Sequence, residues 1–260
     1  MSPMRKNYKL RISYDGSRYF GWEHQPDKDT IQGKIENVLA RMCGLELSGH
    51  DFMEPDCPIE VIGAGRTDAG VHARAMVASV FLDTELTCDE IRDYMNRYLP
   101  DDIAILDVHE ASDRFHARYN AVGKTYRYTL CDSPVRPVFN RKYYTYLDTP
   151  IDTDKMARAA ERIVGEHDFK SFCGNPRMKK STVRNVDRLE VRRSQGYIYI
   201  TVHGTGFLQN MVRIIVGTLI EVGYGRIAVD DIPKILEARD RKIAGPTAPA
   251  KGLCLLKVDY

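Results

Sequence analysis

The segment I-G-A-G-R-T-D-A-G-V-H-A, residues 62–73, constrains the fold more than any other part of this chain. Its three glycines allow sharp backbone turns, and it lies between two β-type runs, residues 59–62 and 75–82. A tight loop between two strands is therefore predicted. Such a loop is suited to presenting one carboxylate, that of Asp68, to a cleft. A polar turn in a hairpin would explain the same spacing.

The glycine spacing partly matches two nucleotide-binding motifs and completes neither of them. A dinucleotide fingerprint, G-x-G-x-x-G, needs a third glycine where this chain has Asp68, and it must open a helix, whereas residues 75–82 are β-rich. A phosphate-binding loop, G-x-x-x-x-G-K-[ST], needs a lysine and a hydroxyl where this chain has Val71 and His72. We therefore do not expect this loop to bind a nucleotide.

The first half of the chain shows strand, helix, strand, strand, helix, strand. Apolar residues alternate in the strands and form a stripe on the helices, with Thr30 and Thr87 as candidate N-caps. The expected elements are strand 8–14, helix 31–42, strands 59–62 and 75–82, helix 88–98 and strand 103–108. This order suggests a split βαβ layout, in which helices cover one face of an antiparallel sheet.

The second half repeats this type of organisation without a residue-level repeat. The expected elements are strand 126–130, helix 154–164, strands 183–191 and 197–203 joined at Gln195-Gly196, helices 207–222 and 230–238, and strand 253–258. We therefore predict an α+β fold of two similar halves, 1–112 and 113–260. Each half has a mainly antiparallel sheet covered by helices, and the active-site cleft lies between them.

Composition limits the cellular setting and the cofactors. The sequence has no run of about 18 apolar residues and no apolar stretch at the N-terminus that could act as a signal, so we expect a cytoplasmic protein with no membrane partner. Its six cysteines lie far apart with no C-x-x-C pair, which indicates neither a zinc site nor a disulfide framework. We expect no metal and no cofactor.

Basic residues are concentrated in two parts of the second half, although the net charge of the chain is only +2. Residues 177–193 carry seven cations and two acids, and residues 114–142 interleave cations with tyrosine, phenylalanine and histidine. Cations bind phosphates and flat rings stack on unpaired bases, so this combination is typical of single-stranded or loop RNA binding. A solvated charged surface is the commoner explanation for any one such run.

Arg213 is unusual because it lies between apolar residues of the predicted helix 207–222. Burial of an unpaired guanidinium costs several kcal/mol, so Arg213 needs a carboxylate partner or water. Its neighbours at helical spacing include Gly217, which would let another segment approach closely. A surface arginine on an amphipathic helix is equally consistent with the sequence.

Six sequence blocks, in order, are similar to those of the TruA-type tRNA pseudouridine synthases. The most specific is G-R-T-D-A-G-V-H-A at residues 65–73. The others are Y-D-G-S-x-Y-x-G-W at 14–22, F-H-A-R at 115–118, Y-R-Y at 126–128, M-V-R-x-I-V-G at 211–217 and G-L-x-L at 252–255. Segments 49–58 and 174–177 do not match the pattern, which leaves the target uridines open.

The resemblance implies a homodimer that isomerises uridine to pseudouridine in the anticodon stem-loop of tRNA, at positions 38, 39 and/or 40, without a cofactor. Asp68 would be the catalytic acid, and Arg66 would fill the stack that the target base leaves. Tyr126 would stack on the target uracil, and Arg213 would pair with Asp68. The basic residues expected to contact the tRNA are Arg118, Arg177, Lys179, Lys180 and Arg184.

The chemistry supports these roles. Moving the glycosidic bond from N1 to C5 of uracil requires the base to detach and rotate, so it must first leave the helix stack. Asp68 must be ionised either to attack the substrate or to stabilise positive charge at C1′, and a cation such as Arg213 favours the ionised form. The sequence does not decide between the covalent and the dissociative route. A tRNA-binding protein without catalysis, or a synthase for other tRNA uridines, is the alternative.

Overall fold

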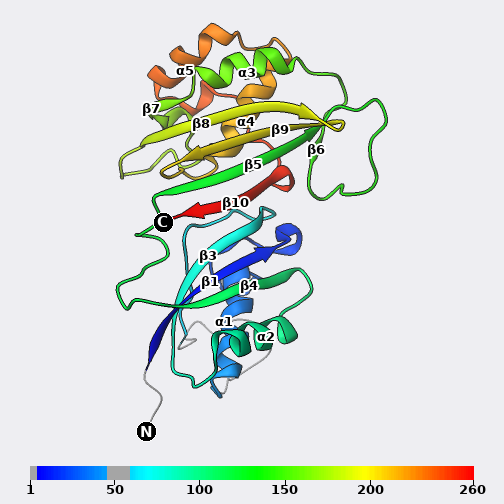
Figure 1. Cartoon of the computed structure of the whole chain (residues 1–260). Coiled ribbons are helices and arrows are strands. Elements are labelled where there is room, and N and C mark those ends of the chain that lie inside the picture. The colour runs from blue at the N-terminus through cyan, green and yellow to red at the C-terminus, as the bar shows by residue number, and fades with distance from the viewer. Residues whose placement is uncertain (1–4, 46–58) are drawn as a thin grey trace. The chain divides into compact units, whose positions relative to one another are not determined.

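The computed structural model describes residues 5–45 and 59–260, and the chain divides into two compact units. Unit 1 is Met1–Ala121 together with Leu255–Tyr260, and unit 2 is Val122–Cys254. Figure 1 labels the elements of both. The segment 49–58 singled out from the sequence lies outside the described residues.

Unit 1 combines a β-sheet with two α-helices. Its strands follow the order β4-β1-β3-β10, with β2 paired to β3, and the β4–β1 and β1–β3 pairs are antiparallel. The elements are β1 (Lys6–Tyr14), the 3-10 turn η1 (Gly16–Arg18), α1 (Ile31–Met42), β2 (Ile62–Gly63), β3 (His72–Leu82), α2 (Cys88–Tyr98), β4 (Ile103–Ala111) and β10 (Leu253–Asp259).

Both helices of unit 1 begin at the threonine caps that the sequence indicated. The side-chain oxygen of Thr30 accepts a hydrogen bond from the Gly33 N–H at 3.2 Å, at the start of α1. Thr87 and Glu90 form a reciprocal capping box at the start of α2. The predicted helices 31–42 and 88–98 are therefore confirmed with their boundaries.

Strand β3 is longer than predicted and includes the end of the glycine-rich segment. Residues 76–80 are all buried, as expected for a strand covered on both faces. The predicted start at residue 75 was too late, because Ala73 already pairs with Tyr14 of β1. The predicted strand 59–62 is reduced to β2, a two-residue pairing of Ile62 and Gly63 with β3.

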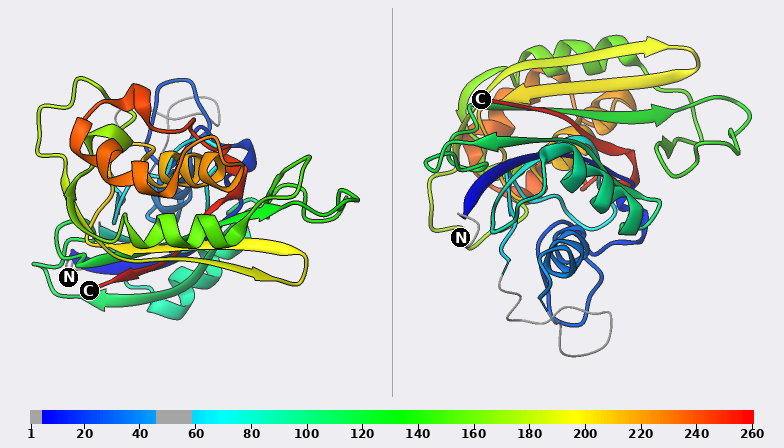
Figure 2. Two further views of the ribbon diagram at one scale, coloured as in Figure 1. Left: turned by 90° about the horizontal axis from the view of Figure 1, so that it is seen from above. Right: turned by 60° about the horizontal axis from the view of Figure 1, so that its bottom comes forward.

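In unit 2, the strands of the sheet follow the order β5-β9-β8-β7 with antiparallel pairs, and the short strand β6 is parallel to β5. Its α-helices all lie on one face of this sheet (Figure 2). The elements are β5 (Gly123–Cys131), β6 (Thr145–Tyr146), α3 (Thr153–Glu161), β7 (Gly165–Asp168), η2 (Phe169–Phe172), β8 (Val183–Ser194), β9 (Tyr197–Gly204), α4 (Met211–Gly223), η3 (Val229–Asp231), α5 (Ile232–Ala238), η4 (Arg241–Ile243) and η5 (Ala250–Gly252).

The α+β class is confirmed, and so is the hairpin across Gln195-Gly196, where both turn residues have positive φ. Helix α4 corrects one prediction, because it begins at Met211 rather than at residue 207. Asn210 adopts the left-handed conformation, with φ +57°, and so separates the apolar residues 207 and 208 from the helix. Among the described residues, no helix is long and apolar enough to cross a membrane.

An ion pair between a buried carboxylate and a partly exposed guanidinium links β5 to β8 in unit 2. Asp132, directly after β5, accepts hydrogen bonds from both Nη atoms of Arg193, at 2.6 and 2.8 Å, and from the Ile151 N–H at 3.2 Å. The carboxylate side chain is only 4% exposed. These hydrogen bonds from Arg193 hold the pKa of Asp132 below its ordinary value, although burial opposes the shift.

We expect Asp132→Asn to destabilise the protein by about 1 to 2 kcal/mol at neutral pH, because it removes a charge-assisted pair. A lowered folded-state pKa contributes stability above the unfolded value, about 3.9 for aspartate, and this contribution disappears as the pH falls through the folded value. The difference in urea unfolding free energy between variant and wild type should therefore shrink between pH 7 and pH 3.5. Asp148→Asn, at an exposed position, is the control. A difference that is constant with pH would contradict this account.

Candidate active site

Asp68 lies in unit 1, on a loop that connects β2 to β3. The loop begins with a backbone hydrogen bond from Ala64 N to Val77 O at 2.8 Å. It ends in a turn in which the Val71 N–H donates to the Asp68 carbonyl at 3.1 Å. Gly70, inside this turn, has φ +78°, a conformation that favours glycine. The side chain of Asp68 is half-buried.

The segment that follows β1, residues 14–22, holds this loop on both sides of Asp68. Before Asp68, the Thr67 carbonyl accepts from the Trp22 N–H at 3.0 Å, and the Thr67 hydroxyl pairs with the Tyr14 hydroxyl at 2.8 Å. After it, the Gly70 N–H donates to the Tyr19 carbonyl at 3.3 Å. Two sequence blocks more than 40 positions apart therefore form one structural unit around the carboxylate.

Two glycines of segment 14–22 are required by this close contact. Gly21 has φ +101°, and a Cβ placed there would lie 2.6 Å from the Thr67 carbonyl oxygen. A Cβ on Gly16 would lie 2.0 Å from the Val71 carbonyl oxygen. Both obstructing atoms are backbone, so a side chain at either position would displace the loop that carries Asp68.

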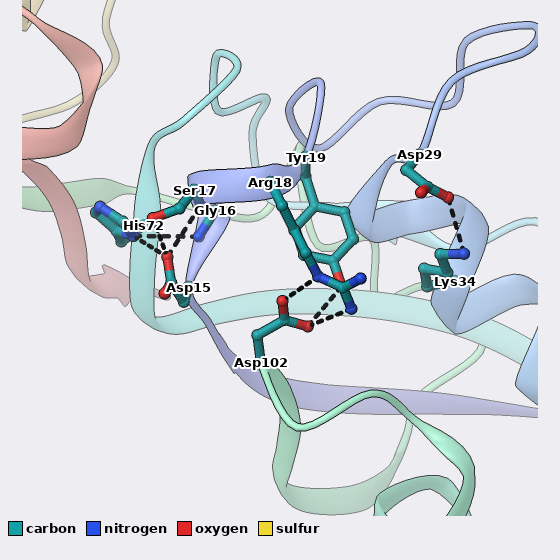
Figure 3. Close-up of polar contacts among 9 residues, drawn as sticks. All are labelled: Asp15, Gly16, Ser17, Arg18, Tyr19, Asp29, Lys34, His72 and Asp102. Carbon is teal, nitrogen blue, oxygen red and sulfur yellow. Dashed lines mark hydrogen bonds and ion pairs between the residues drawn. The ribbon is translucent and has the colours of Figure 1, made fainter. Parts of the chain in front are cut away.

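His72, the first residue of β3, is joined to the same segment (Figure 3). The Gly16 N–H lies 3.1 Å from His72 Nδ1 and donates to it. Oδ1 of Asp15 lies 3.1 Å from the same Nδ1 and accepts hydrogen bonds from the Ser17 N–H and hydroxyl. His72 is 5% exposed, so its contacts are with protein rather than solvent.

Asp102, just before β4, holds residues 15, 18 and 19 of segment 14–22 (Figure 3). It pairs with the Arg18 guanidinium and accepts a 2.5 Å hydrogen bond from the Tyr19 hydroxyl, and its carbonyl accepts from the Asp15 N–H at 2.9 Å. Burial and the bond to Asp102 raise the pKa of Tyr19. Burial alone would raise the pKa of Asp102, but the hydrogen bonds from Arg18 and Tyr19 lower it. Tyr19 therefore remains a donor to an ionised Asp102.

Arg66 lies two residues before Asp68 on the same loop. Its Nη2 atom is 2.5 Å from Oε1 of Glu23, and the two side chains are 60% and 43% exposed. Exposed ion pairs of this kind contribute at most about 1 kcal/mol. Phosphate or base groups can therefore replace Glu23 as the partner of Arg66 at little cost.

Tyr126 and Arg213 belong to unit 2. Tyr126 lies on β5, is 8% exposed and meets the Phe207 ring edge to face, with 5.4 Å between centroids. Arg213, in the first turn of α4, donates from Nε to the Ala248 carbonyl at 2.7 Å and from Nη1 to Asn210 Oδ1 at 2.9 Å. Both of these acceptors are neutral oxygen atoms, and together they orient the guanidinium.

The predicted RNA-binding cations are divided between the units. Arg118 is half-buried in unit 1, in a turn where its N–H donates to His116 Nδ1 at 3.2 Å. In unit 2, Arg177, Lys179 and Lys180 are exposed on the segment that leads to β8. Arg184, at the start of β8, instead donates to the carbonyls of Ser181 and Val183.

Within the described residues, no group of three or more histidine, cysteine, aspartate or glutamate side chains is arranged to hold a metal ion. The cysteines of this part of the chain are free thiols. The residues that the sequence analysis missed are the supporting ones, above all Thr67, Tyr19 and Asp102. Tyr19 stands in the block 14–22, but Asp102 stands in no block, and only the fold brings it to this segment.

Comparison with known proteins identifies the family of this chain. The tRNA pseudouridine synthase family matches residues 11–120 and 159–260. A tRNA pseudouridine synthase A 2 of Bacillus anthracis is 46% identical over 98% of this chain and 99% of its own length. A tRNA pseudouridine synthase A of Clostridium kluyveri is 41% identical over 98% of this chain and 100% of its own length. A tRNA pseudouridine synthase A of Brevibacillus brevis is 42% identical over the same shares.

These matches define the class of the protein as an RNA-modifying isomerase. More specifically, the chain belongs to the tRNA pseudouridine synthase family, of the TruA type that its sequence blocks resemble. Its activity is the conversion of uridine to pseudouridine in tRNA.

We expect Gly21→Ala to lower kcat/KM on tRNA by about tenfold or more, because the added methyl group displaces Thr67 and with it the neighbouring Asp68. Gly196→Ala is a matched control, since Gly196 also has positive φ, +79°, but nothing lies within 4 Å of its added Cβ. Pseudouridine formation and thermal unfolding should be measured for both. If both variants lost activity to the same extent, backbone strain and not contact with the loop would explain the loss. If both kept wild-type activity, the expected displacement of the loop would be contradicted.

Proposed function

We propose that this protein isomerises uridine in the anticodon stem-loop of tRNA, at positions 38, 39 and/or 40, with Asp68 as the catalytic acid. It would act in the cytoplasm as a homodimer that clamps the tRNA. The observation that supports this most directly is the fixation of the Asp68 loop, which is hydrogen-bonded at Thr67 and at Gly70 to segment 14–22. Such pre-organisation is what a reaction at a single ribose carbon requires.

In the proposed reaction the target uridine first leaves the stack, and Arg66 takes its place. A planar, cationic side chain can stack between bases while it contacts phosphate. The exposed pair with Glu23 supports this role, because it is weak enough for Arg66 to exchange Glu23 for another partner.

Asp68 would act on the extruded nucleotide as a carboxylate. In one route its oxygen bonds to C1′ as the C1′–N1 bond breaks, and it is released when C5 bonds to C1′. In the other it stabilises positive charge at C1′ while the glycosidic bond is broken. In both routes uracil rotates so that C5 replaces N1 at C1′, C5 then loses its proton to a base, and N1 takes up a proton. The isomerisation changes no oxidation state, so the proposal involves no redox cofactor.

Tyr126 and Arg213 would complete the site. The edge of Phe207 braces the ring of Tyr126, which supports a role as a fixed stacking surface for uracil. Arg213, oriented by its hydrogen bonds to the Ala248 carbonyl and to Asn210, would supply a positive charge that favours the ionised form of Asp68. Arg118, Arg177, Lys179, Lys180 and Arg184 would bind tRNA phosphates, which predicts binding that weakens with salt.

The central test is Asp68→Asn. It keeps the size of the side chain and removes the charge, so we expect no detectable pseudouridine, with tRNA affinity within about threefold of wild type. Asp83→Asn, at an exposed position after β3, is the control. Positions of pseudouridine should be mapped in unmodified tRNA incubated with each protein. An active Asp68→Asn would exclude Asp68 as the acid, whereas product only outside the anticodon stem-loop would correct the target alone.

Arg213→Met tests the electrostatic role. Methionine preserves much of the stem and loses the charge, so we expect kcat to fall by about tenfold or more with little change in tRNA affinity. Arg226→Met, which removes an exposed arginine paired with Glu221, is the matched control. Single-turnover rates and binding by filter retention separate the two effects. A variant that loses affinity and keeps its rate would place Arg213 among the phosphate-binding residues.

A further inference from the structure

We propose that Tyr128 is a positioning residue for Arg213, acting through the backbone of Ala248 and Pro249. All four residues belong to unit 2, and Tyr128 is fully buried. The inference rests on the proposed function, in which Arg213 supports Asp68, and it adds the group that orients Arg213.

Two hydrogen bonds join Arg213 to Ala248, which lies outside its helix. Its Nε atom donates to the Ala248 carbonyl at 2.7 Å, and its own carbonyl accepts from the Ala248 N–H at 3.1 Å. The direction of the guanidinium therefore depends on where the Ala248 carbonyl lies. A shift of this peptide group would redirect the charge without changing the helix.

Tyr128 fixes the next peptide group. Its hydroxyl donates to the Pro249 carbonyl at 2.7 Å and forms a 2.6 Å hydrogen bond with the Thr145 hydroxyl. Burial raises the pKa of Tyr128 to about 12, against the smaller lowering effects of Thr145 and of the positive charge of Arg213. The hydroxyl therefore keeps its proton at neutral pH. Proline has no N–H, so the carbonyl is the only backbone hydrogen-bonding group by which Pro249 can be held.

The segment 245–249, named here the strap, is also held at its other end. The Gly245 N–H donates to the Thr218 hydroxyl at 2.9 Å, and Arg241 Nη1 donates to the Gly245 carbonyl at 2.9 Å. A Cβ on Gly217 would lie 1.7 Å from the Pro246 carbonyl oxygen, so the strap lies directly against α4. Hydrogen bonds at both ends of the strap therefore restrict the positions open to the Ala248 carbonyl.

The alternative explanation is that Tyr128 matters only because its ring fills the core. Tyr128→Phe separates the two explanations, because it keeps the ring and removes the hydroxyl that holds Pro249. We expect its kcat to fall about tenfold while KM for tRNA stays within about twofold. Tyr146→Phe is the matched control, since its hydroxyl donates at 2.9 Å to Ser133, away from the strap.

A double-mutant cycle tests whether Tyr128 acts through Arg213. Arg213→Lys keeps the positive charge and removes the guanidinium that the Ala248 carbonyl orients. If the strap positions Arg213, adding Tyr128→Phe to Arg213→Lys should lower the single-turnover rate by less than about twofold. Excess enzyme keeps the slow variants measurable, and urea unfolding confirms that each is folded.

Two results would overturn the inference. One is a wild-type kcat for Tyr128→Phe, and the other is a full tenfold loss that persists in the Arg213→Lys background. Failure of the proposed function is seen separately, in an active Asp68→Asn. An inactive Asp68→Asn beside an unimpaired Tyr128→Phe would therefore reject the positioning role alone.

Discussion

The hydrogen bond from the Trp22 N–H to the Thr67 carbonyl is the contact on which the arrangement of unit 1 around Asp68 depends. The approach is close enough to exclude a side chain at Gly21, and the Tyr14 hydroxyl secures Thr67 a second time. The loop that carries Asp68 has no secondary structure of its own, but these hydrogen bonds join it to the segment at the end of strand β1. Its rigidity comes from a segment 45 positions earlier in the chain.

The sequence predicted what local rules determine. Thr30 and Thr87 cap the expected helices, and Gln195-Gly196 forms the expected hairpin, because each depends on nearby residues alone. The start of α4 could not be found in this way, since the left-handed Asn210 is set by tertiary contacts that apolar periodicity does not record. The strand β7 was missed because G-E-H-D lacks an apolar alternation and pairs only at the edge of the sheet.

In the candidate site, too, features set by local sequence were predicted and features set by tertiary contacts were not. Their sequence blocks predicted site roles for Asp68, Arg66, Tyr126 and Arg213, and the structure shows the local contacts of each. Asp102 was not identified, because an aspartate in a turn before a strand has no distinguishing local signal. Its importance lies in three contacts with residues 15, 18 and 19, which only the folded chain brings together. Supporting residues of this kind cannot be predicted from sequence motifs.

The last residues of the sequence belong to the first unit. Unit 2 occupies Val122–Cys254, while Leu255–Tyr260 return to unit 1, where the Tyr260 hydroxyl donates to the Ala117 carbonyl at 2.8 Å and its ring packs on Phe115. A ribosome releases these residues only after all of unit 2 has been made. The residues of β10 that belong to unit 1 are therefore synthesised only after more than a hundred residues of unit 2. The strands of the unit that carries Asp68 can therefore be completed only after the residues of the other unit have been synthesised.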